Sequence, residues 1–280
     1  MARDPSIYVA TGRKGAGKTT TSNQTIIKPY IKPPQQGGQG KNVLIFDTNN
    51  EYSEYPTIAL DITLTKQVGR KKVPNNKAIA EHVTNWCIRT HKGLSRPQIR
   101  RVVPFRPNRD PMTIKEQQLC AEVLLKFFKG GLLVLDDLNN YMLGARSLEM
   151  IGSIVSNRHR NQDILIHFQS LSALDPRLWG NTNIVRMHPQ LDPLRRSVIN
   201  KISNPELFTL AKHVVDQMQV KNPYAYLYIL PLLNKMKGVT KEEFIKGCED
   251  YIRSSKYELK VTNLKQYTKN FARARMHYIE

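Results

Sequence analysis

The stretch TGRKGAGKTT, residues 11–20, has the residue types and the spacing of a loop that binds phosphate. It matches the pattern G-x-x-x-x-G-K-[ST], known as Walker A, in which successive backbone N–H groups surround the phosphates at the start of a helix. We expect Lys18 to reach the β- and γ-phosphates of ATP and Thr19 to bind Mg²⁺. The residues predicted to bind the nucleotide are Gly12, Gly15, Gly17, Lys18, Thr19 and Thr20.

A second stretch, GLLVLDD at residues 131–137, supplies the acidic groups that such a loop needs, a pattern known as Walker B. Its apolar residues predict a buried strand that ends in Asp136 and Asp137. We expect Asp136 to bind Mg²⁺ through water and Asp137 to act as the general base for the attacking water. Another apolar strand ends in Gln169, whose amide can hydrogen-bond the γ-phosphate or that water.

Alternating strand and helix signals predict the elements that position these residues. Apolar runs predict strands at residues 6–11, 42–47, 100–105, 131–137, 163–169, 183–188 and 224–230. Helical periodicity and capping boxes predict helices at 17–30, 76–90, 114–128, 145–158, 205–219 and 241–253. The expected fold class is therefore α/β, a parallel sheet flanked by helices of the RecA-like (ASCE) P-loop NTPase type.

The alternation ends near residue 200, where we place a domain boundary. Residues 1–200 are predicted to form the ATPase core, with a basic and irregular insert at about 66–110. Residues 201–280 are predicted to form a small, mostly helical C-terminal region. Its last segment, 254–280, is basic and polar and is expected to be a tail or arm.

The charge of the chain is strongly unbalanced. The formal net charge is +20 and the pI is near 9.9. Between Lys66 and Asp110, twelve Lys and Arg stand against two acidic residues, so this segment carries half of the excess. Such a concentration favours a polyanionic partner, with nucleic acid first and an anionic membrane second.

Cysteine usage and hydropathy indicate an intracellular protein. Cys87, Cys120 and Cys248 are scattered and form no C-x-x-C pair, which fits a reducing compartment. No apolar run approaches the roughly 20 residues needed to span a bilayer, so no integral membrane segment is expected. The N-terminus lacks the layout of a signal peptide.

Two further stretches resemble the HerA–FtsK superfamily of P-loop ATPases. In VLIFDTNNEYSEY, Asp47, Glu51 and Tyr52 fall where that superfamily has an acid and a Glu-Tyr pair after its second strand. The run from residue 156 to 185, NRH…FQSLSALDP…N, is most similar to ATPases that package the genomes of internal-membrane phages and large DNA viruses. The resemblance covers about residues 6–190.

This resemblance implies an ATPase that moves DNA, either duplex or single-stranded, through a ring, most commonly a hexamer. ATP would lie between neighbouring subunits, and an arginine from the next subunit would complete the site. That arginine lies just before the strand carrying the glutamine, which points to Arg158 first and Arg160 second. A capsid or portal-vertex partner is implied, and the protein would work in the host cytoplasm or associated with the virion.

Three other functions are compatible with parts of the sequence. A Zot-like ATPase that drives filamentous-phage extrusion belongs to the same superfamily, but such proteins usually carry a transmembrane helix. A P-loop kinase of a small metabolite could use the basic insert as a lid over phosphates. A DNA-binding protein with an inactive P-loop is disfavoured by intact Lys18, Thr19, Asp136 and Asp137.

Overall fold

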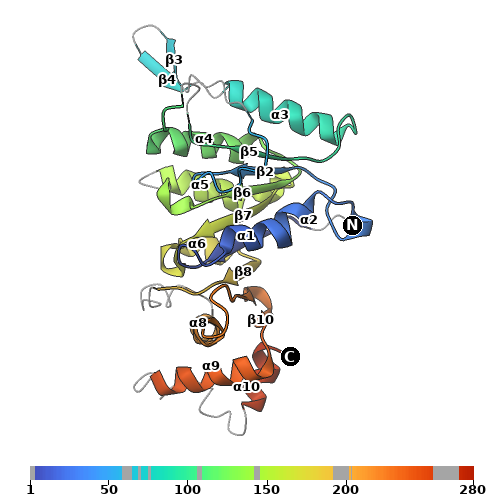
Figure 1. Cartoon of the computed structure of the whole chain (residues 1–280). Coiled ribbons are helices and arrows are strands. Elements are labelled where there is room, and N and C mark those ends of the chain that lie inside the picture. The colour runs from blue at the N-terminus through green and yellow to red at the C-terminus, as the bar shows by residue number, and fades with distance from the viewer. Residues whose placement is uncertain are drawn as a thin grey trace. The chain divides into compact units, whose positions relative to one another are not determined.

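The computed structural model describes residues 4–58, 65–68, 71–74, 77–105, 109–141, 146–191, 202, 204–254 and 271–280 (Figure 1). These residues form an eight-stranded sheet in the order β10-β9-β8-β1-β7-β6-β2-β5. Its strands are β1 (Ile7–Thr11), β2 (Val43–Phe46), β5 (Ile99–Val102), β6 (Leu132–Leu135), β7 (Asp163–Phe168), β8 (Ile184–Met187), β9 (Leu227–Leu230) and β10 (Lys235–Lys237). The α/β class and all seven predicted strands are confirmed.

The predicted helices are also present. The described α-helices are α1 (Lys18–Ser22), α2 (Lys28–Tyr30), α3 (Lys77–His91), α4 (Ile114–Phe127), α5 (Arg146–Val155), α6 (Pro176–Trp179), α8 (Pro205–Gln219), α9 (Lys241–Ser254) and α10 (Ala272–Tyr278). A π-helical segment, η1 (Asn23–Ile27), joins α1 to α2, so the helix predicted at 17–30 is not uniform. Short 3₁₀ segments are η2 (Pro34–Gln36), η3 (Leu138–Asn140), η4 (Asn157–Arg160), η5 (Leu171–Ala173) and η6 (Pro231–Leu233).

The chain divides into two compact units. The first holds the residues up to Ile7 together with Thr19–His167, and the second holds Tyr8–Lys18 and Phe168–Glu280. The boundary predicted near residue 200 falls at residues 192–201, outside the described residues, and stays a prediction. In the part of the chain that the structure describes, no helix combines the length and the apolar character needed to cross a membrane.

Buried parallel strands form the core of the first unit. Strand β2 pairs in parallel with both β5 and β6, and β6 pairs in parallel with β7. Every residue of β2, β6 and β7 is buried, and β2 and β6 are apolar throughout, as expected of buried parallel strands. Parallel strands end at a common edge, so the residues that follow β2 and β6 are brought together.

The basic insert is more regular than the sequence suggested. Strands β3 (Thr65–Val68) and β4 (Lys71–Pro74) form an antiparallel ribbon, in which Lys66 lies opposite Val73. The expectation of irregular structure here, apart from the helix and the strand that border it, was therefore wrong. Closely spaced lysines interrupt the alternation of apolar and polar residues that would have predicted these strands.

In the second unit, β1 and β8 are parallel, whereas β9 runs antiparallel to β8 and β10 antiparallel to β9. Helices α8 and α9 pack side by side (Figure 1). Gly247 permits this contact, because a Cβ at that position would lie 2.4 Å from Val214 Cγ2.

The C-terminus ends in a packed helix rather than in an extended tail. In α10, Ala274 and Tyr278 are buried, and the Tyr278 hydroxyl donates a hydrogen bond to Glu206 Oε1 at 3.0 Å. The expectation of a tail or arm was thus wrong for residues 271–280, while residues 255–270 lie outside the described residues. A seven-residue helix is too short to be identified by periodicity alone.

Candidate nucleotide-binding site

The predicted phosphate loop has a backbone that glycine favours. Gly12, Gly15 and Gly17 have φ angles of 152°, 76° and 83°, which side chains of L-residues rarely allow. At Gly12 there is also no room, since a Cβ would lie 2.6 Å from the Cβ of His188. At Gly15 a Cβ would meet nothing within 4 Å, so the backbone angle alone favours glycine there. The three glycines thus let the loop take the curved path on which phosphate binding depends.

Lys18 is held inside this loop. Its side chain is buried, and Nζ donates hydrogen bonds to the carbonyl oxygens of Gly12 at 2.7 Å and Arg13 at 3.1 Å. The ammonium therefore lies beside the loop backbone at Gly12 and Arg13, where it can bind a negatively charged phosphate. A neutral side chain at position 18 would leave these carbonyl groups without a cationic donor.

Hydrogen bonds within the second unit anchor the loop. The Gly12 N–H donates to the Phe168 carbonyl at 3.2 Å, and the Arg13 N–H donates to the Pro189 carbonyl at 2.9 Å. Gln190 uses both ends of its buried amide, since it donates to Thr11 Oγ1 at 2.9 Å and accepts from the Leu171 N–H at 2.9 Å. The loop is therefore fixed to the segments that follow β7 and β8.

Gln169, the glutamine predicted from the sequence, directly follows Phe168 and has an exposed side chain. It belongs to the same unit as the P-loop residues up to Lys18. The anchoring glutamine, Gln190, was missed because its strand end lies beyond the apolar run at 183–188.

A buried arginine donates a hydrogen bond to the backbone at the end of the loop. Arg186 on β8 is 2% exposed, and its guanidinium donates to the Lys18 carbonyl at 3.0 Å. Its guanidinium carbon also lies 5.8 Å from the centre of the Tyr226 ring, within the range of a cation–π interaction. In the sequence, the sign of this role is a charged residue inside the apolar run NIVRMH.

The acidic pair of the first unit is bridged by an asparagine. Asn49 Nδ2 donates to Asp137 Oδ2 at 2.7 Å and lies 3.4 Å from Asp136 Oδ2. This amide offsets part of the repulsion between the two neighbouring carboxylates. Asp137 has a φ of 42°, in the left-handed region, which turns the chain away directly after the strand. Tyr141 lies nearby, and its pKa is well above the usual value because the ring is buried and the two carboxylates disfavour a phenolate.

His167 connects the acidic strand to the helix that follows the P-loop. Its Nδ1 lies 3.0 Å from Asp136 Oδ1, and its Nε2 lies 2.7 Å from the Ser22 hydroxyl oxygen. One neutral tautomer satisfies both contacts, with Nδ1–H donating to the carboxylate and the hydroxyl donating to Nε2. All three side chains are buried. This histidine was not predicted as a site residue, because it lies inside an otherwise largely apolar strand.

The loop after β2 positions a further carboxylate. Asp47 is fully buried, accepts hydrogen bonds from the N–H groups of Glu51 at 2.9 Å and Tyr52 at 3.1 Å, and forms an ion pair with Arg101 at 2.8 Å. The turn that results presents the exposed Glu51, whose carboxylate accepts a hydrogen bond from the Thr19 hydroxyl. Asp47 therefore has a supporting role, whereas Glu51 touches the predicted metal-binding hydroxyl.

The two candidate arginines differ in environment. Arg160 is half-buried and donates to the Ser153 carbonyl, and burial lowers the pKa of its guanidinium. Arg158 is exposed, in the same 3₁₀ segment η4. Arg160 is thus held by contacts within its own chain, whereas the Arg158 side chain lies at the surface.

Within the units, the structure divides the predicted residues into two sets. Gln169 belongs to the second unit, and so does the P-loop from Gly12 to Lys18. The other predicted residues belong to the first unit, namely Thr19, Thr20, Asp136, Asp137, Arg158 and Arg160. Thr20 is exposed, while Asp136 is buried. The donor sets fit ATP and Mg²⁺, because the loop offers N–H groups and a lysine for phosphate and the first unit offers the hydroxyl and carboxylate oxygens that Mg²⁺ prefers.

Comparison with known proteins supports the fold. No family model and no curated protein sequence matches the chain. The solved structure of the genome packaging NTPase B204 from Sulfolobus turreted icosahedral virus 2 with sulfate is similar at 16% identity, covering 84% of this chain and 96% of that one with a TM-score of 0.50. VirB4 of Thermoanaerobacter pseudethanolicus is similar at 12% identity, covering 80% and 86%, with a TM-score of 0.47. The similarity to the B204 structure supports a P-loop NTPase fold for this chain.

Proposed function

We propose that this chain is an ATP-driven DNA translocase that packages a viral genome into a preformed capsid as a ring of six subunits. The observation that carries the proposal is the phosphate loop, in which three glycines have positive φ and Lys18 Nζ donates to the carbonyl oxygens of Gly12 and Arg13. The fold shared with the packaging NTPase B204 supports the viral role. A capsid or portal-vertex protein would be the docking partner, in the host cytoplasm or on the virion.

In this proposal the site hydrolyses ATP with the help of Mg²⁺. ATP supplies the γ-phosphoryl group that is transferred to water, and Lys18 neutralises charge on the phosphates. Thr19 and Asp136 would hold Mg²⁺, the metal that the sequence motif implies. Asp137 accepts the proton of the attacking water, and Gln169 orients that water or the γ-phosphate. The contact between Asn49 and Asp137 supports the base role, since it holds the carboxylate in one position.

Arg158 is proposed to act on the site of the neighbouring subunit. Its exposure supports this role, and the internal hydrogen bonds of Arg160 argue against the alternative. A guanidinium placed beside the γ-phosphate stabilises the charge of the transition state and commonly changes kcat by about 10³-fold or more. The site would then be complete only between subunits, which couples hydrolysis to the ring.

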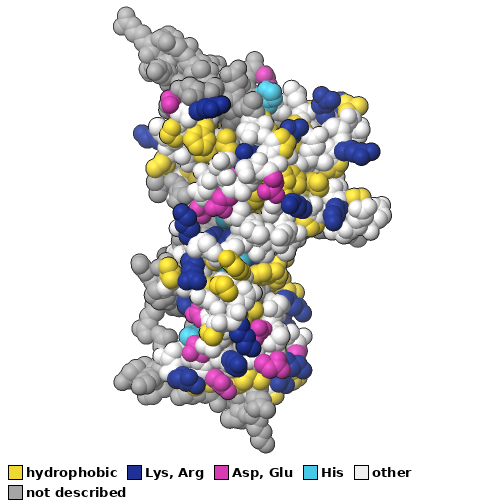
Figure 2. Space-filling model, viewed as in Figure 1, with side chains coloured by type: hydrophobic (Ala, Val, Ile, Leu, Met, Phe, Trp, Pro, Cys, Tyr) yellow, Lys and Arg dark blue, Asp and Glu magenta, His cyan; other side chains and the backbone are white. Residues whose placement is uncertain are grey.

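The partner is DNA, bound through its phosphates and without sequence preference. The net charge of +20 supports this, and affinity should fall steeply with salt. Figure 2 shows Lys and Arg side chains scattered over the visible face of each unit rather than gathered in one patch. Not every arginine of the basic segment 66–110 is available, since Arg101 is paired with Asp47 and Arg100 is bonded to Gln98. The exposed Arg89, Lys92 and Arg96 are better candidates.

Steady-state ATP hydrolysis with and without long double-stranded DNA tests the proposal. We expect DNA to stimulate hydrolysis at low salt, with single-stranded DNA as the second arm. Lys18→Ala and Arg158→Ala should each abolish the stimulated rate, whereas the neighbouring exposed His159→Ala should not. Hydrolysis that ignores both DNA and Arg158, with assembled rings confirmed, would overturn the proposal and favour a kinase or an extrusion ATPase.

A mixing experiment tests whether the site is shared between subunits. Rings made only of Lys18→Ala or only of Arg158→Ala subunits lack one half of every site. In mixed rings, a subunit with an intact Lys18 can lie beside a neighbour with an intact Arg158, so activity should reappear. Mixtures that stay inactive would contradict an arginine acting in trans.

A further inference from the structure

The turn before β9 lies at the same edge of the sheet as the P-loop. Thr11, the last residue of β1, pairs with Met187 of β8, which in turn pairs with Leu227, the first residue of the antiparallel β9. The chain therefore enters β9 at the edge where it leaves β1 for the loop. Two strand spacings of about 4.8 Å separate β9 from β1, so the turn is roughly 10 Å to the side of the loop.

Side-chain packing connects this turn to the P-loop. The Tyr226 ring lies 5.2 Å from the His188 ring and 5.8 Å from the Arg186 guanidinium. His188 is the residue against which Gly12 packs, and Arg186 donates to the Lys18 carbonyl. Both ends of the phosphate loop are thus supported by residues that also support Tyr226.

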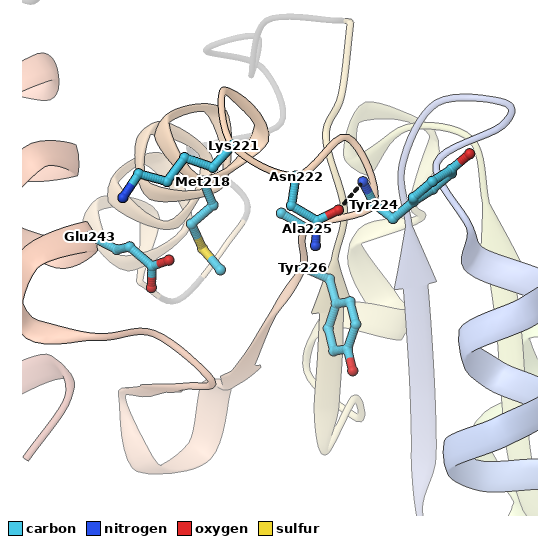
Figure 3. Close-up of a pocket in the computed structure, with 7 residues that line it drawn as sticks. All are labelled: Met218, Lys221, Asn222, Tyr224, Ala225, Tyr226 and Glu243. Carbon is cyan, nitrogen blue, oxygen red and sulfur yellow. Dashed lines mark hydrogen bonds between the residues drawn. The ribbon is translucent and has the colours of Figure 1, made fainter.

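The turn itself is ordered and presents an aromatic ring. Asn222 Oδ1 accepts a hydrogen bond from the Tyr224 N–H at 3.0 Å, and the Ala225 N–H donates to the Asn222 carbonyl at 2.9 Å (Figure 3). Figure 3 shows the Tyr224 ring on the side of the turn opposite to Met218 and Glu243. The Tyr224 side chain is 60% exposed.

A second apolar side chain is exposed near the same sheet edge. Leu191 directly follows Gln190, which is anchored to Thr11, and it is 77% exposed. The sheet edge that carries the phosphate loop thus also carries a leucine and a tyrosine whose side chains are exposed rather than packed in the core. Exposed apolar side chains at the sheet edge that carries a polar binding loop are expected where a flat apolar ligand group is bound.

We propose that Tyr224, together with Leu191, forms the nucleobase-binding face of the nucleotide site. The proposal rests on the proposed ATPase function and adds the part of the substrate that the P-loop does not recognise. The Tyr224 ring stacks on the base while the loop holds the phosphates. Stacking uses the π face that every base has, so this face should bind ATP and GTP with similar affinity.

The cavity in Figure 3 does not offer an alternative place for the base. It lies against the turn, is lined by Met218, Lys221 and Glu243 besides residues of the turn, and has a volume of about 170 Å³. This is below the roughly 300–1,000 Å³ that is typical of ligand pockets. The exposed ring is therefore the better assignment.

Calorimetric binding of a non-hydrolysable ATP analogue and of inorganic tripolyphosphate tests the proposal. Tripolyphosphate occupies the phosphate loop but has no base. Tyr224→Ala should weaken the analogue roughly tenfold or more, as loss of one base–aromatic stack does, and leave tripolyphosphate unchanged. Tyr224→Phe, which keeps the ring, should bind both probes like the unaltered protein. Leu232→Ala is the matched control, because Leu232 is 74% exposed at the opposite end of β9.

Photolabelling gives a measurement that needs no variant. An azido-substituted adenine nucleotide should label the tryptic peptide 222–235, and unlabelled ATP should compete.

Labelling only elsewhere, or an unchanged affinity of Tyr224→Ala for the analogue, would overturn the assignment. Equal weakening of analogue and tripolyphosphate by Tyr224→Ala would also overturn it, because the turn would then act on the loop and not on the base. Failure of the ATPase proposal would look different, since neither probe would depend on Lys18.

Discussion

His167 donates a hydrogen bond from Nδ1 to Asp136 Oδ1 across 3.0 Å, inside the first unit and out of contact with solvent. The other ring nitrogen accepts from Ser22, in the helix that begins with the P-loop lysine. The carboxylate predicted to bind Mg²⁺ is thus oriented by a side chain that touches neither nucleotide nor metal in the proposed mechanism. A metal-binding carboxylate with a fixed second partner is commonly more effective than one free to rotate.

Variants of His167 should separate its effect on the orientation of the Asp136 carboxylate from its effect on the stability of the fold. His167→Phe keeps a ring but removes both hydrogen bonds, so we expect the free energy of unfolding to fall by about 2 kcal/mol. The Mg²⁺ concentration for half-maximal ATP hydrolysis should rise. His167→Asn places an amide nitrogen near the position of Nδ1 and should restore much of the Mg²⁺ response. Urea unfolding and Mg²⁺ titration measure the two effects. A loss of stability with an unchanged Mg²⁺ response would show that His167 serves packing alone.

Glu51 should matter for the metal and not for folding. Its carboxylate accepts a hydrogen bond from the hydroxyl of Thr19, which makes that oxygen more electron-rich and a better metal ligand. We expect Glu51→Gln to raise the Mg²⁺ requirement several-fold while the free energy of unfolding stays within about 0.5 kcal/mol, because the side chain is exposed. Glu54→Gln is the control, since that exposed carboxylate contacts Asn23 and Lys28 instead. Identical Mg²⁺ responses of the two variants would contradict this role.

Arg158 and Arg160 should respond in opposite ways to truncation. Arg160→Ala removes a half-buried guanidinium that donates to the Ser153 carbonyl, and we expect the free energy of unfolding to fall by about 1–3 kcal/mol. Arg158→Ala alters an exposed side chain, so stability should hardly change while DNA-stimulated hydrolysis is lost. Denaturant unfolding and hydrolysis rates of both variants decide the matter. A stable Arg160→Ala protein without activity would reverse the assignment.

Buried thiols should make the protein less stable in alkaline solution. Burial raises the pKa of the Cys120 thiol from 9.0 to about 12. Below pH 9 this thiol is protonated in both the folded and the unfolded chain, so its contribution to stability is fully present there. Between pH 9 and 12 the unfolded chain loses the proton first, so stability falls by up to about 1.4 kcal/mol per pH unit from this group.

Variants that lack one buried thiol test whether that thiol causes the fall in the free energy of unfolding with pH. Cys120→Ala should show a smaller decrease in the free energy of unfolding between pH 8 and 10 than the unaltered protein, as measured by urea titration. Cys248→Ala should act in the same way, because burial raises that thiol's pKa to about 12 as well. Parallel pH profiles for all three proteins would show that these thiols are not the groups responsible.

Much of the fold could be predicted because the signals are local. The apolar runs of β2 and β6 are continuous because both faces of a buried parallel strand are covered, and a capping box marks the start of α4 at Thr113. The β3–β4 ribbon and α10 were missed because the first is rich in lysine and the second is short.

The sequence by itself determined the phosphate loop, the acidic strand end and the order of strands and helices. Each of these depends on residues close together in the chain, through backbone φ preferences and the periodicity of apolar side chains. Only the tertiary structure decided the partners of these residues. Ser22 and His167 are 145 positions apart, and no local pattern encodes their contact. The same holds for the amide of Asn49 at Asp137 and for the carboxylate of Glu51 at Thr19, because hydrogen bonds between side chains on different loops depend on how the sheet brings those loops together.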